Sequence, residues 1–423
     1  MRPSPLAAVV LAAAWAAGCG SPLRWHLART PSQTTVATAL NEAGEENVAG
    51  GTLTAQVPAV PEPVRVRPCC AFGADLRARV GVLPIPLLAI GNIVGPEVIG
   101  PHKFDGGLLA LRPGQDPEAS RDPGERNGLV YTCRGGFIDV AHVRDYADLT
   151  LFLAAQVHHG LRDGATVALR DKGGTRRIVI HPVPAATVDA VGARGLAIAT
   201  AQWLAVRLAI WHEIATWYGW SAFALFPETA SAFSPEDVYS DVVGTRIAGG
   251  IIEAQGADTD TLYEANVNVW LAGVLERLGA QPASVGRAAM FAVDGQWWDS
   301  SRRLPDKQLT IRRNLDIGPF ISPWLVSDAG IGPSTQLLLD KHCGVDAQPI
   351  VLRNPDDYRG LPLREVATLE IDVSPALVDN GLPLPGDATR VTQEDFPAIV
   401  AAIGVAASEL FGTGVDAPLP IGY

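Results

Sequence analysis

A histidine and a glutamate stand side by side in the longest apolar stretch of the chain. His212 and Glu213 interrupt residues 196–220, which are otherwise almost wholly apolar apart from Arg207. Burying two ionisable side chains in a helix costs several kcal/mol unless they are paired, hydrogen-bonded or bound to a metal. The pair therefore indicates either a chemical site or a buried polar network.

Two further groups carry acids, one of them with a histidine, on predicted helices. In the first, Asp139, His142 and Tyr146 fall on one broad face, since successive helix residues turn by about 100°. In the second, Asp237 and Asp241 share a face at i, i+4 spacing. Three groups of one kind in a single region favour a functional role more than a lone histidine does.

Small residues continue the face that carries Asp237 and Asp241. Gly244 and Ala248 follow at helical spacing on the same side. Because neither has a bulky side chain, this face is expected to let a second helix come close.

Residues 212–241 resemble the core of gluzincin-type metallopeptidases. The resemblance implies that His212 is the first zinc ligand and Glu213 the general base. It implies further that Asp237 is a carboxylate ligand and that Asp241 orients a histidine. The chain departs from the family's His-Glu-x-x-His motif at Thr216, because a threonine cannot replace a neutral imidazole as a zinc ligand.

The missing imidazole has one candidate on the first helix. A catalytic zinc needs three protein ligands and an open position, and His142 can supply the third ligand. We therefore expect a metal-dependent, hydrolase-like site that holds zinc or another divalent metal. Its residues are the metal ligands His142, His212 and Asp237, the catalytic Glu213, and the supporting residues Asp241, Asp139, Asp145 and Thr216.

The same groups have a non-catalytic interpretation. His212 and Glu213 facing Arg144, Arg207 or Arg246 would form a buried polar network that binds nothing. The chain would then be a structural or binding lipoprotein of the cell envelope.

The N-terminus predicts export. Arg2 is followed by an apolar run over residues 6–17, which is too short to anchor the chain across a bilayer. Ala16-Ala17-Gly18-Cys19 resembles the lipobox of bacterial lipoproteins, although the family usually has leucine where Ala16 stands. The resemblance implies that residues 1–18 are a signal peptide and that Cys19 is lipidated. The alternative is an ordinary secretory signal with a coincidental Cys19.

The lipid anchor would hold the chain at a bacterial membrane. Gly20 and Ser21 place no aspartate beside Cys19, and by resemblance to enterobacterial sorting rules this favours the outer membrane, facing the periplasm. We expect an unknown envelope substrate or partner there.

Composition excludes other classes of partner. Charged residues make up 18% of the 423-residue chain and the net charge is −12, whereas soluble domains average about 25% charged residues. Because no cluster of lysine and arginine is long enough to bind phosphates, we expect no nucleic-acid partner. The sequence also lacks a Gly-x-Ser-x-Gly nucleophile elbow and a phosphate-binding glycine loop.

The order of elements predicts one α+β domain behind a tether. Residues 19–66 are predicted to be a flexible, lipidated tether, because they contain too few apolar residues to offset the entropy of ordering. Residues 67–423 are predicted to form a single α+β domain with a helix-rich core, short strands and loops rich in glycine and proline. The expected helices are 139–160, 187–218, 234–252, 261–278 and 393–411, and the expected strands are 166–170, 176–181, 308–316 and 366–373.

Four cysteines besides Cys19 can form disulfides in an exported chain. A bridge between the adjacent Cys69 and Cys70 would be strained, so a bridge to Cys133 or Cys343 is favoured. The sequence does not choose between these two.

Most of the chain after the tether has a further resemblance. It is carried by the segments 67–70, 131–145, 212–219 and 235–244. As a set they resemble a bacterial domain-of-unknown-function family of envelope lipoproteins. The resemblance implies the compartment and a single domain, and it implies no chemistry.

Overall fold

The computed structural model describes residues 28–42, 57–68, 70–80, 82–110, 124–171, 173–221, 228–345, 347–386 and 388–412. The predicted signal peptide over residues 1–18 and the predicted lipidation site at Cys19 lie outside these residues.

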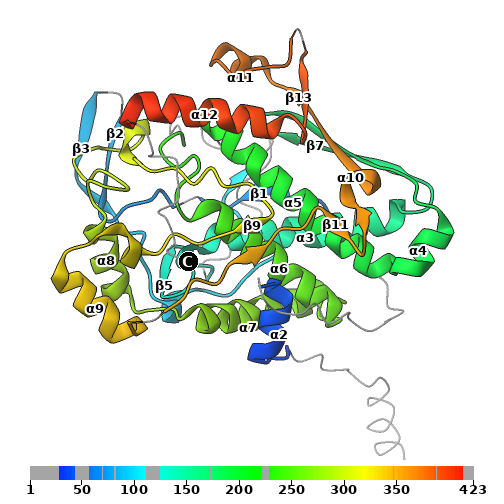
Figure 1. Cartoon of the computed structure of the whole chain (residues 1–423), viewed down its shortest axis with the longest axis horizontal. Helices are drawn as coiled ribbons and strands as arrows, with labels where there is room; N and C mark the ends of the chain where they lie inside the picture. The colour runs from blue at the N-terminus through cyan, green and yellow to red at the C-terminus, as the bar shows by residue number, and fades with distance from the viewer. Residues whose placement is uncertain are drawn as a thin grey trace, which may run out of the picture.

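Helices make up most of the molecule, with short sheets among and around them, which confirms the predicted helix-rich α+β class (Figure 1). The helices are α2 Gln33–Leu40, α3 Val140–Gly160, α4 Ala185–Val191, α5 Ala193–Trp217, α6 Asp237–Glu253, α7 Asp260–Leu278, α8 Ala283–Ala292, α9 Pro333–Cys343, α10 Leu363–Val366, α11 Pro375–Asp379 and α12 Phe396–Phe411.

The largest sheet has four antiparallel strands in the order β14-β13-β8-β7, and the other sheets are two-stranded. The strands are β1 Arg65–Val66, β2 Leu76–Val80, β3 Leu83–Ile90, β4 Leu109–Ala110, β5 Leu129–Thr132, β6 Gly136–Asp139, β7 Ala165–Asp171, β8 Gly174–Ile180, β9 Phe320–Ile321, β10 Leu352–Arg353, β11 Asp357–Tyr358, β12 Leu361–Pro362, β13 Ala367–Val373 and β14 Arg390–Thr392.

Three helices, α3, α5 and α6, pack against one another to form the core. Helix α5 is buried along most of its length, as its apolar sequence predicts. One continuous buried cluster runs from Val36 on α2 to Ala407 on α12. Within the described part of the chain, no helix is long and apolar enough to cross a membrane.

Several predicted elements are confirmed with small shifts in their ends. Helix α3 begins directly after Asp139, whose side chain accepts from the backbone N–H of Ala141 and caps the helix as predicted. The predicted hairpin appears as β7 and β8, and the helices predicted near 261–278 and 393–411 appear as α7 and α12.

The long helix predicted over 187–218 is wrong in one respect, because the chain breaks it into α4 and α5. Gly192 lies between them with φ +88°, a conformation that an α-helix cannot contain. The break leaves α5 free to take its own direction through the core.

The strand predicted over 308–316 is also wrong. This segment forms a 3₁₀ turn at Lys307–Leu309 and then an irregular stretch. Its backbone N–H groups bond to loops instead of a strand: Ile311 donates to the Trp297 carbonyl and Asn314 to the Phe233 carbonyl. Tertiary partners replaced the sheet that local propensity predicts.

The flexible tether predicted over residues 19–66 does not extend over 28–42 or 57–66. Ser32 caps α2 by accepting from the Thr35 N–H, and Val36 and Leu40 are buried where α2 packs on α6 and α7. Farther on, Arg65 and Val66 pair with β4. A short apolar face was enough to dock a segment whose overall composition is polar.

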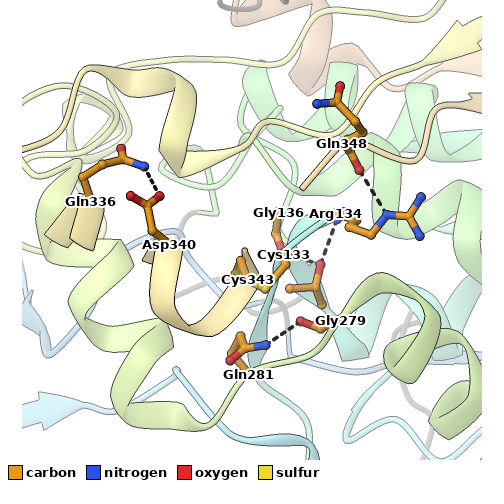
Figure 2. The surroundings of a disulfide bond; sticks show 11 residues. Cys133, Arg134, Gly136, Gly279, Gln281, Gln336, Asp340, Cys343 and Gln348 are labelled. Carbon is orange, nitrogen blue, oxygen red and sulfur yellow. Dashed lines mark hydrogen bonds between the residues drawn. A yellow bond between two sulfur atoms is a disulfide. The ribbon is translucent and has the colours of Figure 1, made fainter. Parts of the chain in front are cut away.

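The disulfide of the described residues joins Cys133 to Cys343, with the two Cα atoms 5.3 Å apart. It links the end of the β5 strand to the end of α9 (Figure 2). The predicted bridge from the Cys69-Cys70 pair to either of these residues is therefore wrong. Cys69 itself lies outside the described residues.

Candidate functional site

Helices α3 and α6 bring together the group of Asp139 and His142 and the group of Asp237 and Asp241. The Nδ1 atom of His142 lies 2.9 Å from Oδ1 of Asp241, one turn from the N-terminus of each helix. The helices can approach this closely because Gly244 has no side chain: a Cβ atom there would lie 2.3 Å from the carbonyl oxygen of Val143. The close packing predicted from Gly244 is confirmed.

Helix α5 brings His212 to the same place. The ring of His212 lies 6.2 Å from the ring of His142 and 4.7 Å from that of Trp220, measured between centroids. Glu213 turns to another side of the helix, where its Oε2 atom accepts from the backbone N–H of Phe233 at 2.6 Å. Consecutive residues of one helix thus serve two surroundings, a pocket and a buried loop.

His142 and His212 line one pocket with a cavity volume of about 80 Å³. Glu62, Arg65, Asp145, Arg176 and Glu228 supply charged groups of both signs to its wall, and Trp220 and Tyr146 supply aromatic surface. A pocket with a few convergent polar groups is the usual form of a small-molecule or ion site.

Five buried acids lie behind the two histidines, and we call them the carboxylate cluster. Some of their oxygens bond to the backbone: Asp237 accepts from the Ser234 N–H at 2.6 Å. Others have no hydrogen-bond partner in the described part of the chain, namely both oxygens of Glu236, Oδ1 of Asp237 and Oδ2 of Asp241. The carboxylate cluster consists of Asp139, Glu213, Glu236, Asp237 and Asp241.

Burial controls the protonation of the carboxylate cluster. It raises the pKa of Glu213 to about 7 and that of Glu236 and Asp237 well above their ordinary values. Mutual repulsion adds to the effect, as Glu213 and Glu236 both raise the pKa of Asp237. The acids closest together therefore do not all ionise at neutral pH unless a positive charge joins them.

Arg313 is the arginine whose charge acts on this cluster, and it does not form ion pairs with it. Its guanidinium donates to the backbone carbonyls of Ala230, Ala232, Lys307 and Thr310. Among the described residues, none of the acids of the cluster lies within 4.0 Å of an arginine or lysine nitrogen. Burial lowers the pKa of Arg313 to about 10, so it stays charged.

His212 is a neutral imidazole at neutral pH. Burial, followed by the neighbouring His142 and Arg176, lowers its pKa to about 3. A neutral ring is the form that binds a metal ion or accepts a proton.

The remaining predicted residues are Asp145 and Thr216. Asp145 lines the same pocket but bonds to Arg67 in a separate group, described below. Thr216 is buried one turn beyond His212, and its hydroxyl has no hydrogen-bond partner within the described residues. Among those residues, no group of three or more histidine, cysteine or acidic side chains is placed to hold a metal ion.

The arginines expected in a buried network are elsewhere. Arg144 bonds to the carbonyls of Arg126 and Gly100, Arg207 pairs with Asp356, and Arg246 bonds to Gln202. Residues that sequence reasoning did not single out, above all Arg313, surround the site instead. Arg313 differs from the other arginine of its segment in being buried. The sequence gives no sign of this, because the segment has the composition of an ordinary strand.

A second buried group lies beside the pocket, and we call it the Arg67 network. The guanidinium of Arg67 donates to Glu125, Asp145 and Asp148 at 2.7–3.1 Å. On its other oxygen, Asp148 lies 2.9 Å from Nε2 of His102. The network ties the segment before β2 to α3, and so it holds one wall of the pocket.

Comparison with known proteins gives one match. A family model described as "Protein of unknown function (DUF4056)" covers residues 57–327, which include both pocket histidines and the whole carboxylate cluster. Neither the curated proteins nor the solved structures contain a match.

Proposed function

The chain belongs to the DUF4056 family, a membership that carries no activity, and we propose from its pocket that it is an exported, metal-dependent, hydrolase-like protein. In this proposal His142 and His212 bind zinc or another divalent cation in the pocket. The cation would lower the pKa of a bound water and so provide the hydrolytic nucleophile.

One observation carries the proposal: Asp241 holds His142 through its Nδ1 atom, next to the ring of His212. Histidines that bind metals commonly donate their other ring N–H to a carboxylate, which fixes the tautomer and raises the basicity of the ligand. Asp241 is thus the orienting acid, and the histidine that it orients is His142.

The charge around the pair supports a cation. Because the ring of His212 is neutral, a metal ion does not have to displace a proton from the ring nitrogen that it binds. Behind it, the oxygens of Glu236 and Asp237 without hydrogen-bond partners favour a positive charge nearby, because a buried carboxylate without one takes up a proton instead. The Arg67 network does not favour a further cation in the same way, since its acids already bond to Arg67.

The other predicted residues take supporting roles in this proposal. Asp237 is not among the residues that line the pocket, and its Oδ1 atom lies 3.9 Å from Nδ1 of His142. We therefore propose that Asp237 completes the ligand set only if a cation draws its side chain forward. Glu213 also does not line the pocket, since its Oε2 atom accepts from the Phe233 N–H. Its pKa of about 7 suits proton transfer at neutral pH, and we propose that it acts as the base only if its side chain turns from this loop toward the pocket.

Export and lipid anchoring at Cys19 also remain proposals, and the N-terminal sequence supports them. An outer-membrane anchor would put the pocket in the periplasm, within reach of envelope substrates. Labelling of the full chain with a radioactive fatty acid in a bacterial host tests this point, with Cys19→Ser as the control that should remove the label.

The metal content of the purified full-length chain tests the main proposal. After purification without chelators, mass spectrometry of the elements should find about one equivalent of a divalent metal, the stoichiometry of a single catalytic site. His142→Ala and His212→Ala should each lose most of it. His159→Ala is the matched control, because His159 is exposed at the other end of α3, and it should keep the metal.

A metal-free wild-type chain, or a metal content that is the same in His142→Ala and the wild type, would overturn the proposal. The alternative is a non-catalytic envelope protein in which these groups are structural. The bonds from Phe233 and Ser234 to Glu213 and Asp237 favour it, since they use the acids to close a loop. It predicts no bound metal, and a loss of several kcal/mol of unfolding free energy in Glu213→Ala.

A further inference from the structure

A second buried arginine, Arg246, has no acid within ion-pair distance among the described residues. It lies on α6 with 6% of its surface exposed. Its Nη1 atom donates to Oε1 of Gln202 at 2.6 Å and its Nη2 atom to the carbonyl of Arg353 at 2.8 Å. Among the residues that the structure describes, the Nε atom has no hydrogen-bond partner and no carboxylate lies within 4.0 Å of the guanidinium; the charge of Glu253 acts on it from farther away. Burying a cation in this way is costly, which asks for a compensating anion.

The guanidinium of Arg246 borders a pocket with a cavity volume of about 310 Å³. Helices α2, α5 and α6 and the segment around Tyr358 form its walls. Gly195, Gly249 and Gly250 line it, so parts of its wall are bare backbone. None of its lining residues lines the pocket of His142 and His212.

The walls of this pocket combine charge with apolar surface. Arg359 adds a second cation, and Glu253 is the acid on the described wall. Burial raises the pKa of Glu253 above its ordinary value, although the charges of Arg194 and Arg246 act to lower it. Ile198 and Leu363 supply apolar surface beside the polar groups. A ligand that matches these walls has one anionic head and a small apolar body.

We propose that this pocket binds a small organic anion, whose oxyanion pairs with the guanidinium of Arg246 and whose apolar part lies against Ile198 and Leu363. Arginine suits this role because its planar fork matches two oxygens of a carboxylate or phosphate. The proposal concerns a site other than the histidine pocket, and it does not depend on the proposed hydrolase function.

Calorimetric titration of the full-length chain with sodium octanoate and, separately, inorganic phosphate tests the proposal. Octanoate carries a carboxylate head on an apolar tail, whereas phosphate is a bare oxyanion. Saturable one-to-one binding of either probe in the millimolar range supports the site. Tighter binding of octanoate identifies a carboxylate with an apolar body, and tighter binding of phosphate identifies a phosphate head.

Two variants locate the binding. Arg246→Met keeps the apolar stem without the charge and should weaken binding by about tenfold or more. Gln202→Glu keeps an acceptor for Arg246 but places a competing carboxylate beside it, and it should weaken binding similarly. Arg364→Met is the control, because the exposed Arg364 lines a different pocket, and it should bind as the wild type does.

The stability of Arg246→Met separates a binding site from a structural arginine. At a binding site the unliganded variant should unfold at the same urea concentration as the wild type or at a higher one, since an uncompensated buried charge is gone. The proposal is overturned if neither probe binds, if Arg246→Met binds as the wild type does, or if all three variants weaken binding equally.

Discussion

The carboxylate cluster and the Arg67 network contain the same kind of side chain in the same kind of interior, yet they handle charge in opposite ways. Both lie against α3. The acids of the carboxylate cluster are all buried, whereas the Arg67 network combines the buried Asp148 with the partly buried Glu125 and Asp145. In the Arg67 network one guanidinium reaches three acids directly. In the carboxylate cluster the nearest arginine, Arg313, gives its hydrogen bonds to backbone carbonyls.

Protonation follows this difference. Burial alone would raise the pKa of Asp148, but His102 and Arg67 bring it below its ordinary value. No comparable lowering occurs at Asp237, whose pKa burial and the neighbouring Glu213 and Glu236 raise. Asp145, whose pKa burial raises to about 7 in spite of Arg67, lies between the two extremes.

The comparison teaches which of the two groups is structural. Acids that bond directly to a buried arginine contribute to the stability of the fold without a further cation. Acids that the fold leaves without a cation persist at a cost in stability, which is typical of sites selected for binding or catalysis. We therefore expect mutations in the two groups to have opposite effects on stability.

Removal of Arg67 should have the largest effect on stability. Arg67→Met leaves Glu125, Asp145 and Asp148 buried without their cation, so the free energy of unfolding should fall by about 3–5 kcal/mol. Urea denaturation followed by circular dichroism measures the change. Arg162→Met, at an exposed arginine, should change stability by less than about 0.5 kcal/mol. A loss below about 1 kcal/mol in Arg67→Met would show that the network is not structural.

The next largest effect should come from the titration of Glu213, which makes the free energy of unfolding depend on pH. With a pKa of about 7 in the folded state and an ordinary value of 4.5, Glu213 binds more protons folded than unfolded between these pH values. Its contribution to stability is therefore complete below pH 4.5 and is lost as the pH rises through 7. Glu213→Gln mimics the protonated acid, so relative to wild type it should gain up to about 3 kcal/mol between pH 5 and pH 8.

Urea denaturation of both chains at the two pH values measures this gain. The titration of His212 acts in the opposite direction, because its lowered pKa removes stability as the pH falls below about 6.5. Since both chains contain His212, the difference between them isolates Glu213. If the free energy of unfolding depended on pH equally in the two chains, Glu213 would not be a carboxylate that lacks a compensating cation.

Gly244→Ala should separate the helices that build the site. The new Cβ atom would lie 2.3 Å from the carbonyl oxygen of Val143, so α3 and α6 must move apart at a cost of about 1–3 kcal/mol. Thermal unfolding measures the cost, and metal content measures the loss of the contact between His142 and Asp241. Gly91→Ala is the control, since a Cβ atom at Gly91 meets no other atom within 4 Å. Equal stability of the two variants would mean that the helices are not held in close contact.

Asp237→Asn should have the smallest effect and the most informative sign. Asparagine keeps an oxygen for the Ser234 N–H and removes a charge that the fold does not neutralise. The variant should unfold at pH 8 with about 1 kcal/mol more free energy than the wild type. Asp148→Asn, the matched change in the Arg67 network, should be less stable than the wild type. A loss of stability in both variants would remove the distinction between the two groups.

Local signals predicted much of this fold. The N-cap at Asp139, the turn between β7 and β8 and the apolar face of α12 are each visible within a few residues of sequence, because capping, turn conformation and amphipathic spacing depend on near neighbours. Where a distant partner decided the outcome, local signals were misleading. The segment around Asn314 reads as a strand, but its N–H groups bond to Trp297 and Phe233.

The candidate site divides along the same line. The sequence by itself determined that Glu213 would be buried and that the helix carrying Asp241 could approach another closely, since both follow from composition and helical periodicity. Only the tertiary structure decided that Asp241 meets His142, that Arg313 gives its hydrogen bonds to carbonyls, and that Arg67 pairs with the acids beside the pocket. These contacts join residues far apart in the chain, and the energy of a buried charge depends on the partners that folding brings to it.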